Sequence, residues 1–282
     1  MYKIGLSTTG KELEPKLFED AKNAGIDCFE VSRRYDGYDN LDYQGLRKMA
    51  DDYGIKLWSF HLPFKPFDFI DISTADKEWR KKSVAYIAEV LKKGADIGFD
   101  KFILHSGGLT KRQTQKEVDD RLNCACESYA EMAEIAQKEG GVICVENLPP
   151  VCVGKDISEV KKLISADERL KVCFDTNHLL PGDGAEFIKA FADKIITIHV
   201  SDYDFVNERH WVPGEGKLDF QKIYSALQEV NYQGPWLYEL SFDAASDGMV
   251  RERDINCFDI VKNANEIFQN KPLTRIPGHV EL

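Results

Sequence analysis

Short apolar runs alternate with longer amphipathic stretches along the chain. The apolar runs have the length of strands and carry branched and aromatic residues at both odd and even positions. This composition is typical of strands that are covered on both faces, as in a parallel sheet. Eight such runs occur, at residues 3–7, 28–32, 56–61, 101–105, 142–146, 171–175, 195–201 and 236–240.

The stretches between these runs repeat apolar residues at helical spacing. In residues 83–94 the apolar positions are 84, 87, 88 and 91, and a glycine stands at the end. This spacing predicts an amphipathic helix with a glycine stop. Similar patterns predict helices over residues 120–138, 220–230 and 254–268.

Eight strands in strict alternation with about eight helices predict a single-domain α/β protein with the (β/α)8 TIM-barrel fold. The competing fold is an open doubly wound sheet, which usually has a glycine-rich turn after its first strand. Residues 7–11 read Ser-Thr-Thr-Gly-Lys and contain no such turn. We expect the barrel to span residues 1–270. The tail, residues 271–282, is predicted to be non-helical and either mobile or packed across a partner.

Six consecutive predicted strands, the third to the eighth, end in a histidine, aspartate or glutamate. Four of the six histidines of the chain lie at these strand ends, and His210 lies in the loop after the seventh strand. The carboxyl ends of barrel strands form the face that carries the active site. We therefore expect one polar cluster there, made of His61, His105, Glu146, Asp175, His178, His199 and Glu239.

Imidazole nitrogens and carboxylate oxygens are suitable ligands for a divalent metal such as Mn, Zn, Co, Fe or Mg. The expected metal ligands are Glu146, Asp175, His199 and Glu239, and further metals could be held by His61, His105, His178, Glu208 and His210. Each residue alone also has a structural explanation, because a strand-end carboxylate can cap a helix and a strand histidine can be hydrogen-bonded in the core. Glu208 lies in a polar stretch that could be a solvated loop. The combination favours a metal site.

Net charge indicates which binding partners to expect, and cysteine content indicates the cellular compartment. Lys and Arg total 37 and Asp and Glu total 48, which gives a net charge of −11 and disfavours nucleic acid as a partner. No apolar run is long enough for a membrane span, and seven cysteines without a CxxC pair indicate reduced thiols in a cytoplasmic protein. A homo-oligomer is possible. Without a Walker A motif or a Rossmann glycine pattern, we expect no nucleotide cofactor.

The residues around the strand ends form four motifs that resemble a known family. The motifs are Val-Glu-Asn at 145–147, Phe-Asp-Thr-Asn-His-Leu at 174–179, Ile-His-Val-Ser-Asp at 198–202 and Pro-Gly-Glu-Gly at 213–216. They resemble the sugar phosphate isomerase/epimerase family of xylose isomerase-like TIM barrels, a superfamily that also includes endonuclease IV. The resemblance covers about residues 1–270 and implies a TIM barrel.

The resemblance implies two different sets of site residues. In the branch similar to ketose 3-epimerases, one divalent metal is held by residues matching Glu146, Asp175, His199 and Glu239, and substrate is bound by those matching His178 and Arg209. We expect His61 and His105 to bind substrate as well. In the branch similar to endonuclease IV, three zinc ions are held by residues matching His61, His105, Glu146, Asp175, His178, His199, Glu208, His210 and Glu239. The sequence departs from the second branch at Asn177, where its motif has cysteine, and at Glu208, where it has aspartate.

We expect a divalent-metal-dependent isomerase or epimerase that acts on a small-molecule carbohydrate: a sugar, a sugar phosphate or a related polyol. The metal would stabilise an enediolate, and Glu146 and Glu239 would be the acid and base. Three alternatives remain open. They are an endonuclease IV-like multi-zinc phosphodiesterase acting on abasic DNA, a sugar dehydratase or lyase with the same enolate chemistry, and a binding barrel without turnover.

Overall fold

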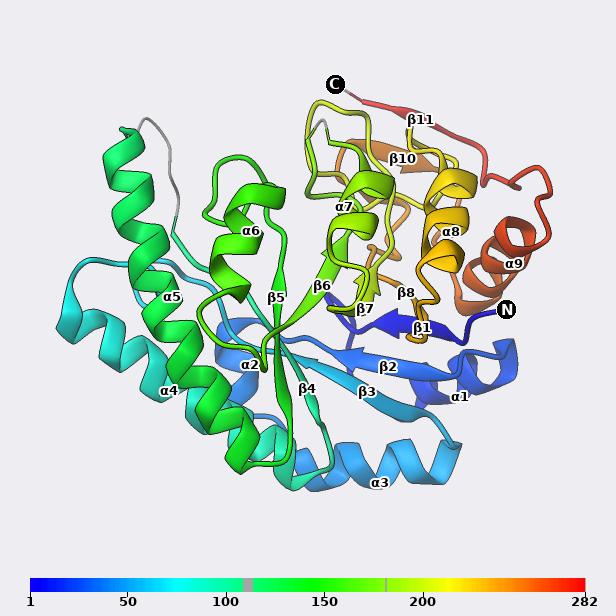
Figure 1. The fold of residues 1–282 in the computed structure, drawn as a ribbon. Helices are drawn as coiled ribbons and strands as arrows, with labels where there is room; N and C mark the ends of the chain where they lie inside the picture. The colour runs from blue at the N-terminus through cyan, green and yellow to red at the C-terminus, as the bar shows by residue number, and fades with distance from the viewer. Residues whose placement is uncertain (109–113, 181, 282) are drawn as a thin grey trace.

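The computed structural model describes residues 1–108, 114–180 and 182–281, and it confirms the predicted barrel (Figure 1). Eight parallel strands form one sheet in the order β7-β6-β5-β4-β3-β2-β1-β8, and a bridge between Val200 and Tyr238 joins its two outer strands. The strands are β1 (Ile4–Ser7), β2 (Cys28–Val31), β3 (Lys56–His61), β4 (Lys101–Leu104), β5 (Val142–Glu146), β6 (Lys171–Asp175), β7 (Ile195–His199) and β8 (Trp236–Tyr238).

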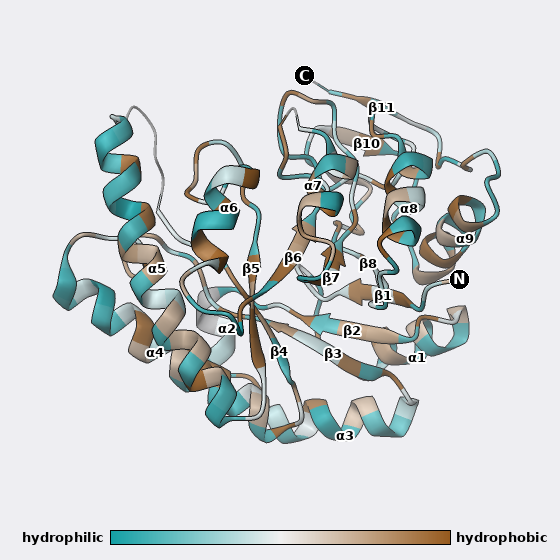
Figure 2. Cartoon of the chain, viewed as in Figure 1, coloured by the Kyte–Doolittle hydropathy of each residue, from teal (hydrophilic) through white to brown (hydrophobic). Residues whose placement is uncertain are grey.

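Helices surround the strands on the outside of the barrel (Figure 1). In the described ranges they are α1 (Pro15–Ala24), α2 (Tyr35–Asp39), α3 (Tyr43–Tyr53), α4 (Lys77–Asp96), α5 (Gln115–Lys138), α6 (Ile157–Ile164), α7 (Gly184–Ala190), α8 (Phe220–Glu229) and α9 (Cys257–Phe268). Hydropathy follows this arrangement, since the strands are largely apolar and the helices carry many polar residues (Figure 2). No helix in the described part of the chain is both long and apolar enough to cross a membrane.

The helices differ from the prediction in their number and in where they begin and end. Two helices rather than one, α2 and α3, lie between β2 and β3. The helix expected over 83–94 begins earlier, at Lys77, because the Asp76 side chain accepts hydrogen bonds from the backbone N–H groups of Glu78 and Trp79 and so caps the first turn. It also continues through Gly94 to Asp96, so the predicted glycine stop is wrong. The helix expected over 120–138 likewise begins earlier, at Gln115.

The interior of the barrel is filled by small and apolar side chains. Ile103, Cys144 and Cys173 form a buried cluster. Gly5 lies so close to the neighbouring strand β8 that a Cβ there would be 2.9 Å from Leu237 Cγ. Because strand side chains alternate between two faces, the residues two positions later point to the same side. That next layer, at the carboxyl ends of the strands, consists of Ser7, Glu30, His61, His105, Glu146, Asp175, His199 and Glu239.

Two irregularities in strand pairing decide which side chains meet in this layer. The register between β6 and β7 shifts after Val172, so that Asp175 pairs with His199. In an unshifted register Asp175 would pair with Ile198, whose side chain points to the opposite face. A second shift, between β2 and β3, brings Glu30 opposite Ser59.

The end of the chain forms part of a second, small sheet. Strands β9 (Ala245–Ser246), β10 (Met249–Arg251) and β11 (Gly278–Val280) pair in the antiparallel order β11-β10-β9. The tail therefore contains a strand, and that strand pairs with a segment of its own chain after β8. The sequence pattern did not predict this sheet.

Candidate metal centre

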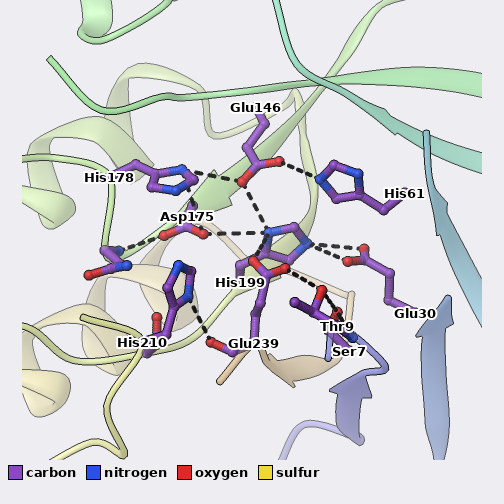
Figure 3. A network of polar contacts seen from close by, with 12 residues as sticks. Ser7, Thr9, Glu30, His61, Glu146, Asp175, His178, His199, His210 and Glu239 are labelled. Atoms are coloured by element: carbon purple, nitrogen blue, oxygen red, sulfur yellow. Dashed lines mark hydrogen bonds and ion pairs between the residues drawn. The ribbon is translucent and has the colours of Figure 1, made fainter. Parts of the chain in front are cut away.

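Four of the predicted ligands gather at the centre of the mouth of the barrel. Glu146, Asp175, His199 and Glu239 each offer a ligand atom, and these atoms all lie within 4.8 Å of one another. The His199 Nδ1 atom is 3.1 Å from Glu146 Oε1, 3.5 Å from Asp175 Oδ2 and 3.0 Å from Glu239 Oε2 (Figure 3). All four side chains are buried. The structure thus brings together the four residues that the sequence analysis predicted as metal ligands.

The chemistry of this group fits a divalent cation. Asp175 Oδ2 is buried without a hydrogen-bond partner among the described residues, and a buried polar atom of this kind costs free energy unless a ligand or ion pairs with it. Three carboxylates around a single imidazole also repel one another. A divalent ion coordinated by three carboxylates and one nitrogen would relieve both costs.

Interactions between the carboxylates and the histidines shift the pKa values of this group when no metal is bound. Burial alone would raise the pKa of the Glu146 carboxyl, but the imidazoles of His105 and His199 outweigh it and hold that pKa well below its usual range. For Glu239, burial is likewise outweighed, mainly by His199, and its pKa is lowered. Burial disfavours the charged form of His199, yet the nearby carboxylates raise its pKa well above the ordinary value.

Two further groups of histidines and carboxylates lie next to the central one, and the Cys173 thiol forms another group with Glu146 and His199. His61, His105 and Glu146 form the first, in which Glu146 Oε2 is 3.4 Å from His61 Nε2 and 3.0 Å from His105 Nε2. His178, Glu208 and His210 form the second, with Glu208 Oε1 3.2 Å from His178 Nε2 and 3.3 Å from His210 Nε2. Every histidine and carboxylate nominated as a ligand therefore belongs to one of three adjoining groups.

The second of these groups is held together by charge. Burial lowers the pKa of a histidine, but the hydrogen bond to Glu208 outweighs burial at His210 and raises its pKa to about 9. Burial is also outweighed at Glu208, where hydrogen bonds from His178 and His210 lower the pKa of the carboxyl. These contacts join Glu208 to the two histidines, although its side chain stays 41% exposed and the surrounding residues 205–208 are exposed.

A cavity of about 670 Å³ opens above the candidate metal centre, and its volume is in the usual range for small-molecule sites. Its floor carries members of all three ligand groups, and its wall is apolar. The wall comes mainly from the loops after β3 and β5, with Pro63, Phe64, Pro66, Phe67, Leu148, Pro149 and Val151. Three cationic residues, Arg33, Arg34 and Lys65, also line it.

Arg209, nominated as a substrate ligand, does not line this cavity. Its guanidinium Nε donates to Asp204 Oδ2 at 2.8 Å, and its Nη1 donates to the backbone oxygen of Asp247 at 3.1 Å. Its backbone N–H donates to Asn177 Oδ1 at 3.1 Å, which ties the loop after β7 to the end of β6. A contact between its side chain and substrate stays a prediction.

The structure adds residues that the sequence interpretation missed. Glu30 is fully buried beside His199, and Thr9 Oγ1 donates to Glu239 Oε1 at 3.0 Å. The signal for Glu30 was present, because it is an acidic residue at the end of an apolar run, like Glu146. Thr9 carried no comparable signal, since its contact depends on the neighbouring positions of β1 and β8.

Metal binding is expected to release protons and to strengthen as pH rises. The pKa values of His178 and His199 are higher in the metal-free folded protein than in the unfolded chain. Protonation of these histidines therefore stabilises the metal-free fold below about pH 6.5, and this stabilisation is lost as pH rises through the pKa values of the folded state. The pKa values of Glu146 and Glu239 are lower in the folded protein than in the unfolded chain. Their ionised forms therefore stabilise the fold above about pH 4.3, and this stabilisation is lost as pH falls through the pKa values of the folded state. The metal-free protein is therefore best supported between these limits, whereas metal ligation requires unprotonated imidazole.

Calorimetric titration with Mn²⁺ in two buffers of different ionisation enthalpy measures this proton release. Binding heats that are equal in both buffers, together with an affinity that does not change between pH 6 and 8, would contradict the prediction.

Comparison with known proteins agrees with this architecture. The family model described as a xylose isomerase-like TIM barrel matches residues 18–255. An uncharacterized protein of Methanocaldococcus jannaschii is 24% identical over 233 residues, which is 81% of this chain and 89% of that protein. Fructoselysine 3-epimerase of Escherichia coli O157:H7 is 22% identical over 257 residues, covering 84% of this chain and 90% of the enzyme.

Solved structures show the same fold. A D-tagatose 3-epimerase-like protein superposes with a TM-score of 0.79 at 19% sequence identity, covering 95% of this chain and 97% of the other. The family match spans seven of the eight barrel strands and the four residues of the candidate metal centre. The chain belongs to the xylose isomerase-like TIM barrel family.

Proposed function

We propose that this protein is a divalent-metal-dependent epimerase or isomerase of a sugar or related polyol. The observation that carries the proposal is the pair of buried carboxylates, Glu146 and Glu239, which both approach the Nδ1 atom of His199, at 3.1 and 3.0 Å (Figure 3). A binding protein has no need of two carboxylates that can exchange a proton with one ligand. The named relatives, fructoselysine 3-epimerase and the D-tagatose 3-epimerase-like protein, support carbohydrate chemistry.

In this proposal Glu146, Asp175, His199 and Glu239 would hold the metal, which would supply Lewis-acid polarisation of the substrate carbonyl. One of the two glutamates takes the proton from the carbon next to the carbonyl, which leaves an enediolate. The other glutamate, protonated when the substrate binds, would deliver its proton to the opposite face and invert that carbon. The two glutamates would thereby exchange protonation states in each turnover. His178, whose Nδ1 contacts the backbone oxygen of Asn147 at 2.9 Å, orients a substrate hydroxyl, and the apolar wall of the cavity excludes water.

The lining of the cavity favours a substrate with an anionic substituent. Arg33, Arg34 and Lys65 bring positive charge to the cavity in a protein whose net charge is −11. The volume also leaves room for a substituent beyond the sugar itself. We therefore include phosphorylated and carboxylate-bearing ketoses among the candidate substrates.

Metal analysis and a substrate screen test the proposal. Protein purified without added metal is analysed for elements, and about one divalent ion per chain is expected. The metal-loaded protein is then incubated in deuterium oxide with ketoses, ketose phosphates and ketoses linked to amino acids. Epimerisation gives a product with deuterium on the carbon next to the carbonyl, whereas a dehydratase gives loss of water. A metal-loaded protein that exchanges no such proton on any of these compounds would refute the proposal.

A second candidate function is favoured by one observation, the presence of three adjoining ligand groups that share Glu146 or lie beside it. Three zinc ions could occupy them, as in an endonuclease IV-like phosphodiesterase. About three equivalents of zinc per chain, together with cleavage of DNA at abasic sites, would replace our proposal with this one.

A further inference from the structure

We infer that Glu30 is the positioning residue for the metal-binding imidazole of His199, an inference that rests on the proposed metal-dependent function. His199 Nε2 lies 2.9 Å from Glu30 Oε1 and 3.0 Å from Glu30 Oε2, and both side chains are fully buried. The other ring nitrogen, Nδ1, faces the three carboxylates of the metal centre (Figure 3). The ring is therefore held between one outer carboxylate and the metal position.

Local strand geometry fixes Glu30 in this place. The register shift between β2 and β3 leaves Trp58 unpaired and sets Glu30 opposite Ser59, and such bulges redirect side chains near functional sites. Ser59 Oγ donates to Glu30 Oε2 at 2.7 Å. The strand register thus places the Glu30 carboxylate beside the His199 ring, and Ser59 adds a second, outer hydrogen bond to it.

The contact with Glu30 determines which nitrogen of the His199 ring carries the proton. A neutral imidazole carries its single proton on one nitrogen, and an ionised carboxylate can only accept a hydrogen bond. Glu30 therefore keeps the proton of neutral His199 on Nε2, which leaves the lone pair of Nδ1 free for a metal. Glu30 itself is not a ligand in any of the groups of converging ligand atoms found among the described residues.

The test is the affinity for Mn²⁺ alone, measured by competition with a chelator, in the full-length protein. Glu30→Ala and Glu30→Gln are expected to bind Mn²⁺ ~10–100-fold more weakly than the wild type, the usual effect of losing a carboxylate behind a metal-bound histidine. The matched control is Ser59→Ala, which removes the other hydrogen bond to Glu30 but leaves the contact with His199. Its Kd is expected to stay within a few-fold of the wild-type value.

A second readout separates positioning from packing. In the Zn²⁺-loaded protein, ¹⁵N chemical shifts of the His199 ring are expected to show the proton on Nε2. In Glu30→Gln the side-chain amide can also donate, which permits the proton on Nδ1 and gives a mixture of ring forms. If Glu30→Ala does not fold, Glu30→Gln alone supports or overturns the inference.

An unchanged Kd for Mn²⁺ in folded Glu30 variants would overturn the inference, and so would an Nδ1 proton in the wild-type Zn²⁺ form. The failure of the proposed function is a separate result, because it consists of a metal-loaded wild type that epimerises no sugar. In that case the comparison of Kd values between the wild type and the Glu30 variants still decides the role of Glu30.

Discussion

Replacing Glu239 by glutamine is expected to give a folded protein whose turnover falls by a factor of ~10²–10⁴ at saturating metal, the usual contribution of a general acid or base. Glutamine keeps an oxygen that can accept the hydrogen bond from Thr9 Oγ1, now 3.0 Å from Glu239 Oε1. It loses the negative charge that faces His199 Nδ1 at 3.0 Å, and with it the ability to take up or deliver a proton. The measurement is kcat on the substrate that the screen identifies.

Glu159→Gln is the matched control for Glu239→Gln. Glu159 is also buried, but it does not line the cavity, and its Oε2 accepts a hydrogen bond from the backbone N–H of Gly154 at 2.8 Å. Its replacement is expected to leave kcat within a few-fold of the wild-type value. If Glu239→Gln retained near-normal kcat with metal bound, the mechanism with two carboxylates would fail.

Replacing Asp175 by asparagine is expected to separate stability from metal binding. Asparagine keeps the oxygen that accepts the backbone N–H of Asn177, which Asp175 Oδ1 now accepts at 2.6 Å. It removes one of three buried carboxylates that repel one another, so the Tm of the metal-free protein is expected to stay the same or to rise. Because a direct ligand is lost, metal affinity should fall by more than the ~10–100-fold that follows loss of an outer partner.

Thermal unfolding with and without metal measures both effects of Asp175→Asn. In the wild type, added Mn²⁺ should raise Tm, because a ligand that binds only the folded state stabilises it. In the variant that increment should disappear at the same metal concentration. If added Mn²⁺ raised the Tm of the variant as much as that of the wild type, Asp175 would not be a metal ligand, and the predicted set of four ligands would be wrong.

The fold could be predicted because its signals are local. Strands covered on both faces leave continuous apolar runs, and three of the eight predicted runs, at 56–61, 142–146 and 171–175, coincide with β3, β5 and β6. Four others, β2, β4, β7 and β8, end one to two residues earlier than predicted, and β1 begins one residue later. Helix starts were less accurate, because the capping contact of Asp76 moves the start of α4 to Lys77.

The candidate site could be nominated for a similar reason. The closed barrel brings the carboxyl ends of all its strands to one mouth, so a polar residue at each strand end is enough to predict that these residues converge. His61, His105 and Glu146 show this, since they come from different strands and meet within hydrogen-bonding distance. The assignment of a role to each residue remains a proposal.

Other features depend on contacts between segments that are distant in sequence. The pairing of Asp175 with His199 requires the register shift between β6 and β7, and the pairing of Arg209 with Asp204 and Asp247 requires the folded loops after β7 and β8. The strand at 278–280 forms only against β10. None of these contacts leaves a periodic pattern in the sequence.

The sequence by itself determined the barrel, its parallel order of strands and the ring of ligand-type residues at its mouth, because hydrophobic periodicity and chain order are sufficient for these features. Only the tertiary structure decided which ligand atoms share one centre, that Glu30 stands behind His199, and that cationic residues from the loops after β2 and β3 line the cavity. The physical reason is that strand register and loop packing set distances of a few ångströms, and metal coordination and hydrogen bonding depend on distances of that size.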